Sequence, residues 1–366
     1  MDFIPLARPG INEEDIQRAV EVLRSGMLVQ GKNVDAFEKA FAKFHGVEHA
    51  IAAANGTATL HLALIASGIG KGDEVIVPAF SYVATANAVE LVGATPVFVD
   101  IDIATFNIDV SKIEEKITSS TKAIIPVHEF GLACDIEKVC QIASQNNLLV
   151  IEDAACALGA VQNSKPVGSF GQWGSFSLHP RKSITSGEGG MLTTNNSEMM
   201  LKVRALRNHG IDSQKSEMDF IDAGFNYRMT DFQAALVTGQ IERLQSILKY
   251  KNEIADIYFS EIKNSAITLP IIPPGFNHTW QTFHILLDDS RNQKETIALL
   301  KEKNIGSNYG AQCIPAQTFY RKKYNYDVVR HYPNACRAYT QGLALPIYDK
   351  LSKEETHYIS KTINAL

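Results

Sequence analysis

The sequence predicts an α/β protein whose core is a mainly parallel β-sheet. Short apolar segments that suit strands alternate along the chain with segments in which apolar residues recur at helical spacing. Strands that alternate with helices imply right-handed crossovers between parallel neighbours. Polar residues also follow several of these strands directly, and ligands bind beyond the carboxyl ends of strands in sheets of this kind.

The composition indicates a globular enzyme with room for about two domains. The chain has 366 residues, 45% hydrophobic and 20% charged, and a net charge of −5 without a basic block, so we expect no nucleic-acid surface. The five cysteines show neither CxxC nor Cys/His zinc spacing, which predicts reduced thiols, no metal site and a cytoplasmic protein. The first residues lack signal-peptide features and no run of about 18 apolar residues occurs, so we expect no membrane association.

The chain begins with two predicted helices. Residues 13–24 place Ile16, Val20 and Leu23 on one helical face, and residues 33–45 repeat this spacing of apolar residues. A glycine follows each segment, as is common where helices end.

A predicted strand at 49–54 leads through Asn55, Gly56 and Thr57 into a helix rich in leucine and alanine. A helix N-terminus offers unpaired N–H groups and a positive dipole end, which suit a phosphate. Gly56 allows the backbone to approach such a ligand closely, and Thr57 can add a hydroxyl. The alternative is an ordinary strand–turn–helix connection capped by Asn55 or Thr57.

The alternation then continues to the middle of the chain. The next predicted strands are 74–77, 96–100, 123–127 and 148–151, and the helices between them are 84–92 and 135–146. Thr57, Tyr82, His128 and Asp153 each come just after a strand, so we expect them at one edge of the sheet. Tyr82 could stack there on a flat cofactor ring or simply pack in the core.

The stretch Ser175–Gly190 combines serines, one lysine in a polar turn and a glycine cluster. A lysine amine forms a Schiff base with an aldehyde such as pyridoxal phosphate (PLP) when its neighbours lower its pKa. PLP also needs a carboxylate against its ring nitrogen and a cradle for its phosphate. Lys182, Asp153 and the turn at Gly56 supply these three elements. Taken singly, a surface lysine and a helix-capping aspartate remain the alternatives.

The last third of the chain predicts a smaller α+β unit. Its expected elements are a strand at 283–287 and helices at 292–303 and 352–366. Before it, we expect a strand at 191–194 and helices at 197–206 and 230–248. We therefore assign residues 1–250 to a large cofactor-binding domain and 251–366 to a small C-terminal domain, on which the N-terminal segment can also pack.

These motifs together resemble the DegT/DnrJ/EryC1/StrS family of PLP-dependent sugar aminotransferases, within the fold-type I aspartate aminotransferase superfamily. The resemblance covers nearly the whole chain and rests on residues 25–31, 55–58, 78–85, 152–155, 175–190, 224–229, 308–310 and 345–348. It implies a large domain with a mainly parallel seven-stranded sheet and a smaller C-terminal α+β domain.

The resemblance also implies roles for single residues. Lys182 is the Schiff-base lysine and proton shuttle, Asp153 keeps the ring nitrogen protonated, and His179 lies near the substrate as a third catalytic candidate. The other cofactor-binding candidates are Gly56, Thr57, Ala58 and Ser177 at the phosphate, Tyr82 against the ring, Cys156, and Asn226 at the phosphate of the partner subunit. The site would thus lie at a homodimer interface. Cys156 stands where the family often has Gln or His, and a thiol makes only weak hydrogen bonds.

The activity that the resemblance implies is transfer of an amino group from L-glutamate to a keto group of a nucleotide-linked deoxysugar. The product would enter cell-surface polysaccharide, lipopolysaccharide or an antibiotic. One alternative is a PLP-dependent sugar dehydratase, which Lys182 disfavours because those relatives carry histidine at this position. A regulatory protein that binds PLP without turnover is another, although no helix-turn-helix or basic patch supports it. A purely structural α/β protein is the third.

Overall fold

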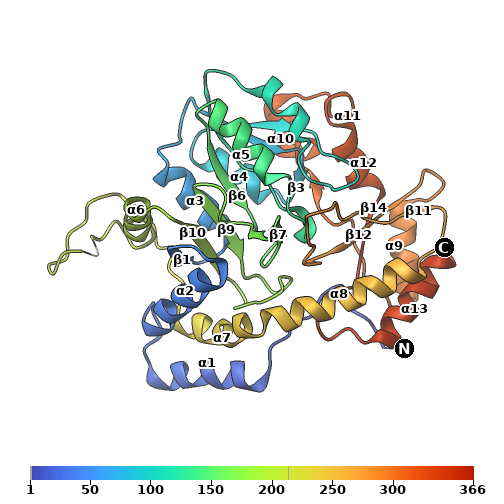
Figure 1. Ribbon diagram of the computed structural model, residues 1–366, viewed down its shortest axis with the longest axis horizontal. Coiled ribbons are helices and arrows are strands. Elements are labelled where there is room, and N and C mark those ends of the chain that lie inside the picture. Colours follow the sequence, from blue (N-terminus) through green and yellow to red (C-terminus); the bar gives the residue numbers. More distant parts are fainter. Residues whose placement is uncertain (1, 213) are drawn as a thin grey trace.

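The computed structural model describes residues 2–212 and 214–366 and is built around one seven-stranded sheet (Figure 1). The strands in order across the sheet are β1 (His49–Ala53), β10 (Gly190–Thr194), β9 (Trp173–Ser177), β6 (Leu149–Asp153), β5 (Thr121–Ile124), β2 (Glu74–Pro78) and β4 (Thr95–Val99). β10 is antiparallel to both of its neighbours, and the pairs from β9 to β4 are parallel. The predicted mainly parallel, seven-stranded sheet is confirmed.

Helices cover both faces of this sheet. The helices are α1 (Glu13–Ser25), α2 (Lys32–His45), α3 (Gly56–Ala66), α4 (Ala84–Leu91), α5 (Ile136–Gln145), α6 (Ser197–Arg207), α7 (Asp231–Glu242), α8 (Leu244–Glu261), α9 (Gln293–Glu302), α10 (Thr318–Tyr324), α11 (Val328–His331), α12 (Pro333–Gln341) and α13 (Lys353–Asn364). Side chains alternate along each strand, so Ile51 of β1 faces the layer of α3, whereas Ala50 and Ala52 face the layer of α2 and α7.

A buried ion pair ties three elements of this arrangement together. Glu38 of α2 accepts hydrogen bonds from Arg207 Nη1 of α6 at 2.6 Å and from the backbone N–H of Ala52 in β1 at 2.9 Å. Arg207 Nη1 also donates to the carbonyl of Ala52, and both charged side chains are only 4% exposed. The pair therefore fastens the edge strand to a helix on each face of the sheet.

The predicted helix 230–248 is wrong as a single element. The structure ends α7 at Glu242 and begins α8 at Leu244, with Arg243 at φ −94° and ψ −1° between them. Arg243 donates to both carboxylate oxygens of Asp15 in α1, at 2.7 and 3.1 Å. The break thus serves a tertiary ion pair, and no glycine or proline marks it in the sequence.

Two further differences lie in the central sheet. Residues 173–177 form the interior strand β9, an element that was not expected from the sequence. A side chain at Gly174 would collide with the backbone of Gly168, so close packing explains why this strand is poor in apolar residues. The strand expected at 123–127 is shorter, because β5 ends at Ile124 and Val127 makes only an isolated bridge to Asp153.

The remaining strands are short or belong to a second sheet. They are β3 (Phe80–Ser81) paired with β13 (Gln312–Cys313), the hairpin β7 (Val161–Gln162) and β8 (Lys165–Pro166), and the antiparallel set β11 (Ile267–Thr268), β12 (Phe283–Leu287) and β14 (Gly342–Leu345). Ile4 joins the apolar core of this second sheet and pairs its backbone with residues 304 and 306.

The helix α8 serves two apolar cores. Its Ile247 and Leu248 pack with the central sheet, whereas Ile254 and Tyr258 pack with β12 and α13. Figure 1 shows this helix running from the base of the central sheet to the C-terminal elements. The division at residue 250 stays a prediction, since it falls inside this continuous helix. Across the part of the chain that the structure describes, no helix combines the length and apolar character needed to cross a membrane.

The Glu38 pair gives a stability prediction. We expect Glu38→Ala to lower the free energy of unfolding by about 3–5 kcal/mol, because it leaves the buried Arg207 guanidinium without its counter-charge. Urea unfolding followed by circular dichroism measures this loss. The exposed neighbour Lys39 on the same helix is the control, and Lys39→Ala should change stability by less than about 0.5 kcal/mol. Equal effects of the two substitutions would contradict the structural role of the pair.

Candidate active site

A cavity of about 730 Å³ opens where strands of the central sheet end. Its volume lies within the range of sites for small organic ligands. Nine of the residues that the sequence singles out line it together, namely Gly56, Thr57, Ala58, Tyr82, Asp153, Cys156, Ser177, His179 and Lys182. They come from stretches as far apart as residues 56 and 182, and the ends of β1, β6 and β9 bring them to one place.

Asp153 is the last residue of β6, and its carboxylate is buried at the cavity. Its Oδ2 accepts a hydrogen bond from Thr85 Oγ1 at 2.8 Å, and its Oδ1 accepts one from the N–H of Ala155 at 3.2 Å. Burial raises the pKa of Asp153, while these two donors and the charge of Lys182 oppose the rise. The carboxylate is therefore oriented toward a cationic partner that a ligand can supply.

Lys182 lies in a turn just beyond β9. Its N–H donates to the carbonyl of His179 at 2.8 Å, and its Nζ lies 3.1 Å from Cys156 Sγ. The loop that carries it is fixed by Gln240 of α7, whose side-chain amide forms hydrogen bonds of 2.9 Å with both the N–H and the carbonyl of Thr185. The amine is thus held beside the thiol inside the cavity.

The N-terminus of α3 forms one wall of the cavity. Asn55 caps this helix by accepting a hydrogen bond from the N–H of Ala58 at 2.8 Å. The preceding N–H groups, of Gly56 and Thr57, have no acceptor within the helix, as in the first turn of any helix. A Cβ on Gly56 would lie only 3.1 Å from the Cβ of Ser177, so glycine keeps this corner open for an anion.

His179 and Tyr82 frame the same cavity. His179 donates its N–H to Ser177 Oγ at 3.3 Å and accepts the N–H of Arg181 at its Nδ1. Partial burial lowers the pKa of His179, so its imidazole is neutral at physiological pH. The side chain of Tyr82 is 66% exposed at the cavity, available to a ring that enters. The stacking role of Tyr82 and the substrate-side role of His179 stay predictions.

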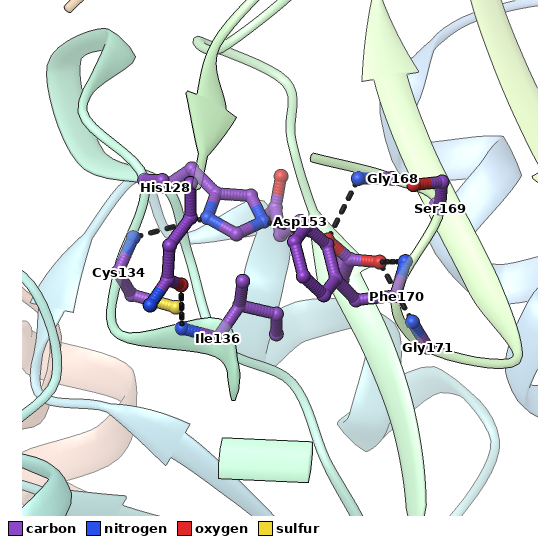
Figure 2. A network of polar contacts seen from close by, with 12 residues as sticks. His128, Cys134, Ile136, Asp153, Gly168, Ser169, Phe170 and Gly171 are labelled. Carbon is purple, nitrogen blue, oxygen red and sulfur yellow. Dashed lines mark hydrogen bonds and ion pairs between the residues drawn. The ribbon is translucent and has the colours of Figure 1, made fainter. Parts of the chain in front are cut away.

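His128 does not join the cavity, contrary to the expectation for residues that follow strands. Its imidazole is fully buried, with Nε2 3.1 Å from Glu152 Oε2 and Nδ1 accepting the N–H of Cys134 (Figure 2). Glu152 also accepts backbone N–H groups from Gly168, Phe170 and Gly171 at 2.7–2.8 Å. Residues alternate along β6, so Glu152 points away from the cavity while Asp153 points into it. His128 serves the structural network instead.

Two side chains at the cavity, Thr85 and Glu129, were not predicted as site residues from the sequence. Thr85 orients Asp153, and its only signal was the short distance in sequence from Tyr82. Glu129 lines the cavity. The sequence prediction had placed its neighbour His128 there instead. Burial and the nearby Asp153 raise the pKa of Glu129 to about 8, against the charge of Lys182.

Asn226 lies outside the cavity lining. It is exposed, and its Oδ1 accepts a hydrogen bond from Arg228 Nε at 3.1 Å. Thr230, not Asn226, is the N-cap of α7. The side chain of Asn226 is therefore not needed to begin the helix, and its predicted contact with a partner subunit stays a prediction.

The residues of the cavity fit PLP. An amine at Lys182, an oriented carboxylate at Asp153 and an anion corner at Gly56 lie on one cavity wide enough for the cofactor. The buried Glu129 Oε2 has no hydrogen-bond partner among the described residues, which indicates that a polar group of a ligand belongs there. Within residues 2–212 and 214–366, no cluster of His, Cys, Asp and Glu suits a metal ion.

Comparisons with known proteins place these features in one family. The model of the DegT/DnrJ/EryC1/StrS aminotransferase family matches residues 9–364. A GDP-perosamine synthase from Caulobacter vibrioides is 43% identical over 289 residues, which cover 78% of each chain. A UDP-4-amino-4-deoxy-L-arabinose–oxoglutarate aminotransferase from Shewanella sediminis is 33% identical, with coverage of 100% of this chain and 98% of that protein.

The solved structures agree with this match. The fold superimposes on Spr1654 of Streptococcus pneumoniae, assigned as a sugar aminotransferase and solved in its PMP form, with a TM-score of 0.94 and 31% identity. The alignment covers 99% of this chain and 97% of the other. The PLP form of the same protein superimposes with a TM-score of 0.93.

The contact between Thr85 and Asp153 gives a prediction on cofactor binding. Thr85→Val removes a hydrogen bond to a charged group, worth about 1.5–3 kcal/mol, so we expect PLP affinity to fall about tenfold or more. The pKa of Asp153 should rise further. When the pH is lowered, its carboxylate is then protonated, and PLP binding weakens, at a higher pH than in the wild type. Equilibrium dialysis of PLP across a pH series measures both effects. Thr85→Ser keeps the hydroxyl and should bind like the wild type; equal binding by the valine variant would contradict this role.

Proposed function

We propose that this chain, which belongs to the DegT/DnrJ/EryC1/StrS aminotransferase family, transfers an amino group from L-glutamate to a keto group of a nucleotide-linked sugar. The observation that carries the proposal is the shared cavity of Lys182 and Asp153 at the N-terminus of α3.

The cofactor is PLP, which supplies a ring that withdraws electrons from the carbon bearing the amino group. Asp153 would hold the protonated ring nitrogen, because its buried carboxylate is already oriented by Thr85 and the N–H of Ala155. The free N–H groups of Gly56 and Thr57, with the Ser177 hydroxyl, would hold the phosphate. The cofactor would thereby be held at both ends, by backbone and side-chain groups at the ends of β1, β6 and β9.

Lys182 would move the proton during the reaction. Its amine would hold the cofactor and, when free, would carry the proton that leaves the carbon bearing the amino group. The turn at His179 and the amide of Gln240 hold the backbone in place, so the long side chain of Lys182 supplies the movement. The neutral imidazole of His179 lies on the same wall and can bind a substrate hydroxyl.

The substrate class follows from the relatives. One relative makes GDP-perosamine and another is named for UDP-4-amino-4-deoxy-L-arabinose and oxoglutarate. Both names describe amino sugars on nucleotides, and the second supports the glutamate/2-oxoglutarate pair as the source of nitrogen. We infer a ketosugar acceptor, a product used in cell-surface polysaccharide or lipopolysaccharide, and a cytoplasmic location.

A homodimer with shared sites is part of the proposal. Asn226 is exposed beside Tyr227, which lines the cavity. Met27 and Val29 lie in a loop near the start of α7 and are 72% and 68% exposed. The carbonyl of Leu28, between them, accepts a hydrogen bond from the N–H of Asp231. Exposed apolar groups next to the predicted intersubunit residue support an interface on this side.

The main alternative remains a PLP-dependent sugar dehydratase. Lys182 argues against it, because the dehydratases of the family carry histidine there. The amine at this position lines the cavity and has a thiol, Cys156, as its neighbour. A transferase needs this amine in every turnover.

Absorbance spectra test the proposed function. The purified protein with PLP should show a visible band that decreases when L-glutamate is added, with 2-oxoglutarate released in equal amount. GDP- and UDP-linked ketosugars should then restore the band and exchange their keto oxygen for an amino group, which mass spectrometry detects. A protein that binds PLP but leaves the spectrum unchanged with every amino donor tested would refute the transferase.

The assignment of Lys182 gives the next prediction. We expect Lys182→Ala to fold and to hold PLP non-covalently but to lose transamination, because no other amine can replace the proton shuttle. Borohydride reduction followed by peptide mapping should label Lys182 in the wild type and no residue in the variant. Lys251→Ala is the matched control for the loss of a nearby lysine, since its amine donates to Ser183 outside the cavity lining. Wild-type turnover by Lys182→Ala would disprove the assignment.

Subunit mixing tests the shared site. Asn226→Ala should weaken PLP retention without unfolding the protein, if its side chain completes the phosphate site of the partner. After exchange with Lys182→Ala, each mixed dimer would have one site with both lesions and one intact site. Random exchange should then restore about a quarter of the wild-type activity. Mixtures that stay inactive after verified exchange would rule out a contribution across the interface.

A further inference from the structure

Glu129 is a buried carboxylic acid on the cavity wall without an assigned task. It is 4% exposed, and its Oε2 has no hydrogen-bond partner among the residues that the structure describes. Buried polar atoms without a partner are rare, and leaving one unpaired costs about 1–3 kcal/mol. A group that enters the cavity is the natural partner for this oxygen.

The backbone around Glu129 is fixed, so the side chain cannot easily turn away. Its N–H donates to Asn107 Oδ1 at 2.8 Å. The next two residues, Phe130 and Gly131, have φ values of 56° and 105°, and Gly131 packs so closely on Thr279 that a Cβ would collide with it. A constrained turn that aims a carboxyl group into a ligand cavity indicates a binding role.

The groups that face Glu129 come from four parts of the chain. They are Asp153 at the end of β6, Cys156 beyond it, Lys182 in the loop after β9, and Ser81 of β3. Asp153 accepts two hydrogen bonds, which favour a negative charge on that residue. Burial and this charge raise the pKa of Glu129 to about 8, so at neutral pH it is a neutral acid with one O–H to donate.

The position of Cys156 shows which part of the cofactor lies nearby. Its Sγ is 3.1 Å from Lys182 Nζ, so it lies beside the place where the amine meets the aldehyde carbon of PLP. The phenolic oxygen of PLP is bonded to the adjacent ring carbon and carries negative charge. The phosphate, the ring nitrogen and the aldehyde carbon have their partners in Gly56, Asp153 and Lys182, and the phenolic oxygen has none.

We propose that the carboxylic acid of Glu129 donates a hydrogen bond to the phenolic oxygen of PLP, in place of the amide or imidazole that relatives often carry at the position of Cys156. A thiol is a weak donor, and its pKa is raised further here by burial, so Cys156 alone leaves this oxygen poorly solvated. Glu129 and Cys156 thus form one compensating pair. The inference rests on the proposed PLP chemistry.

The pH titration of the visible band tests the inference on the complete, PLP-loaded protein. A donor to the phenolic oxygen stabilises negative charge there and so loosens the proton on the nitrogen that links Lys182 to PLP. Glu129→Ala should raise the midpoint of this titration by about one to two pH units, the equivalent of a hydrogen bond to a charged group. It should also retain PLP about tenfold less well during dialysis.

Two further variants keep the test decisive. Glu129→Gln retains a donor of the same shape, so its midpoint should stay near the wild-type value and its band should titrate in one step. The wild type should show a second, coupled step from Glu129 itself. Adding Cys156→Gln to Glu129→Ala should restore the midpoint, because the family-like amide replaces the lost donor. Melting temperatures confirm that each variant is folded.

The outcomes separate this inference from the proposed function. If the wild-type band responds to L-glutamate but Glu129→Ala titrates and retains PLP like the wild type, the hydrogen bond is disproved and the transferase stands. A glutamine variant as defective as the alanine variant, or a failed rescue by Cys156→Gln, also overturns it. If the wild type forms no visible band, the PLP chemistry itself fails.

Discussion

The site depends on the hydrogen bonds that the buried carboxylate of Glu152 accepts. It accepts three backbone N–H groups from residues 168–171 and contacts the ring of His128. This one side chain therefore joins the end of β6, the loop after β5 and the turn that leads into β9. A buried charge is stable only when it is fully hydrogen-bonded, so these three segments are held in one arrangement. Asp153, the next residue along the strand, points to the opposite face and is held in position by the same network.

The three carboxyl groups near the site lie in different surroundings and have different roles. Glu152 is surrounded by N–H donors on the structural side, whereas Asp153 and Glu129 share the cavity side with Lys182. Two acids and one amine cannot all be charged cheaply in a buried space. The hydrogen bonds to Asp153 favour a negative charge on that residue. Electrostatics at the site is thus set by backbone geometry as much as by residue type.

Much of this could be predicted from the sequence, because the signals were local. Apolar periodicity located most strands and helices of the central sheet. The lysine, the carboxylate and the glycine turn pointed to Lys182, Asp153 and Gly56, and the family resemblance added further residues of the cavity wall. The signals failed where tertiary contacts decide. Nothing local shows that Arg243 breaks a helix to reach Asp15, or that a serine- and glycine-rich stretch is the interior strand β9. His128 and Glu129 are adjacent, and only the turn at Phe130 determines which of them faces the cavity.

The backbone pairing of Ile4 with residues 304 and 306 bears on the order in which the protein forms during synthesis. Ile4 pairs with residues that lie about three hundred positions later in the chain. The edge strand β1 likewise pairs with β10 across a long stretch of chain. Contacts this distant in sequence close slowly, so the apolar surface around Ile4 stays exposed during synthesis until the segment near residue 305 has been made. Efficient production of this enzyme therefore depends on how well the emerging N-terminal half is shielded from other chains.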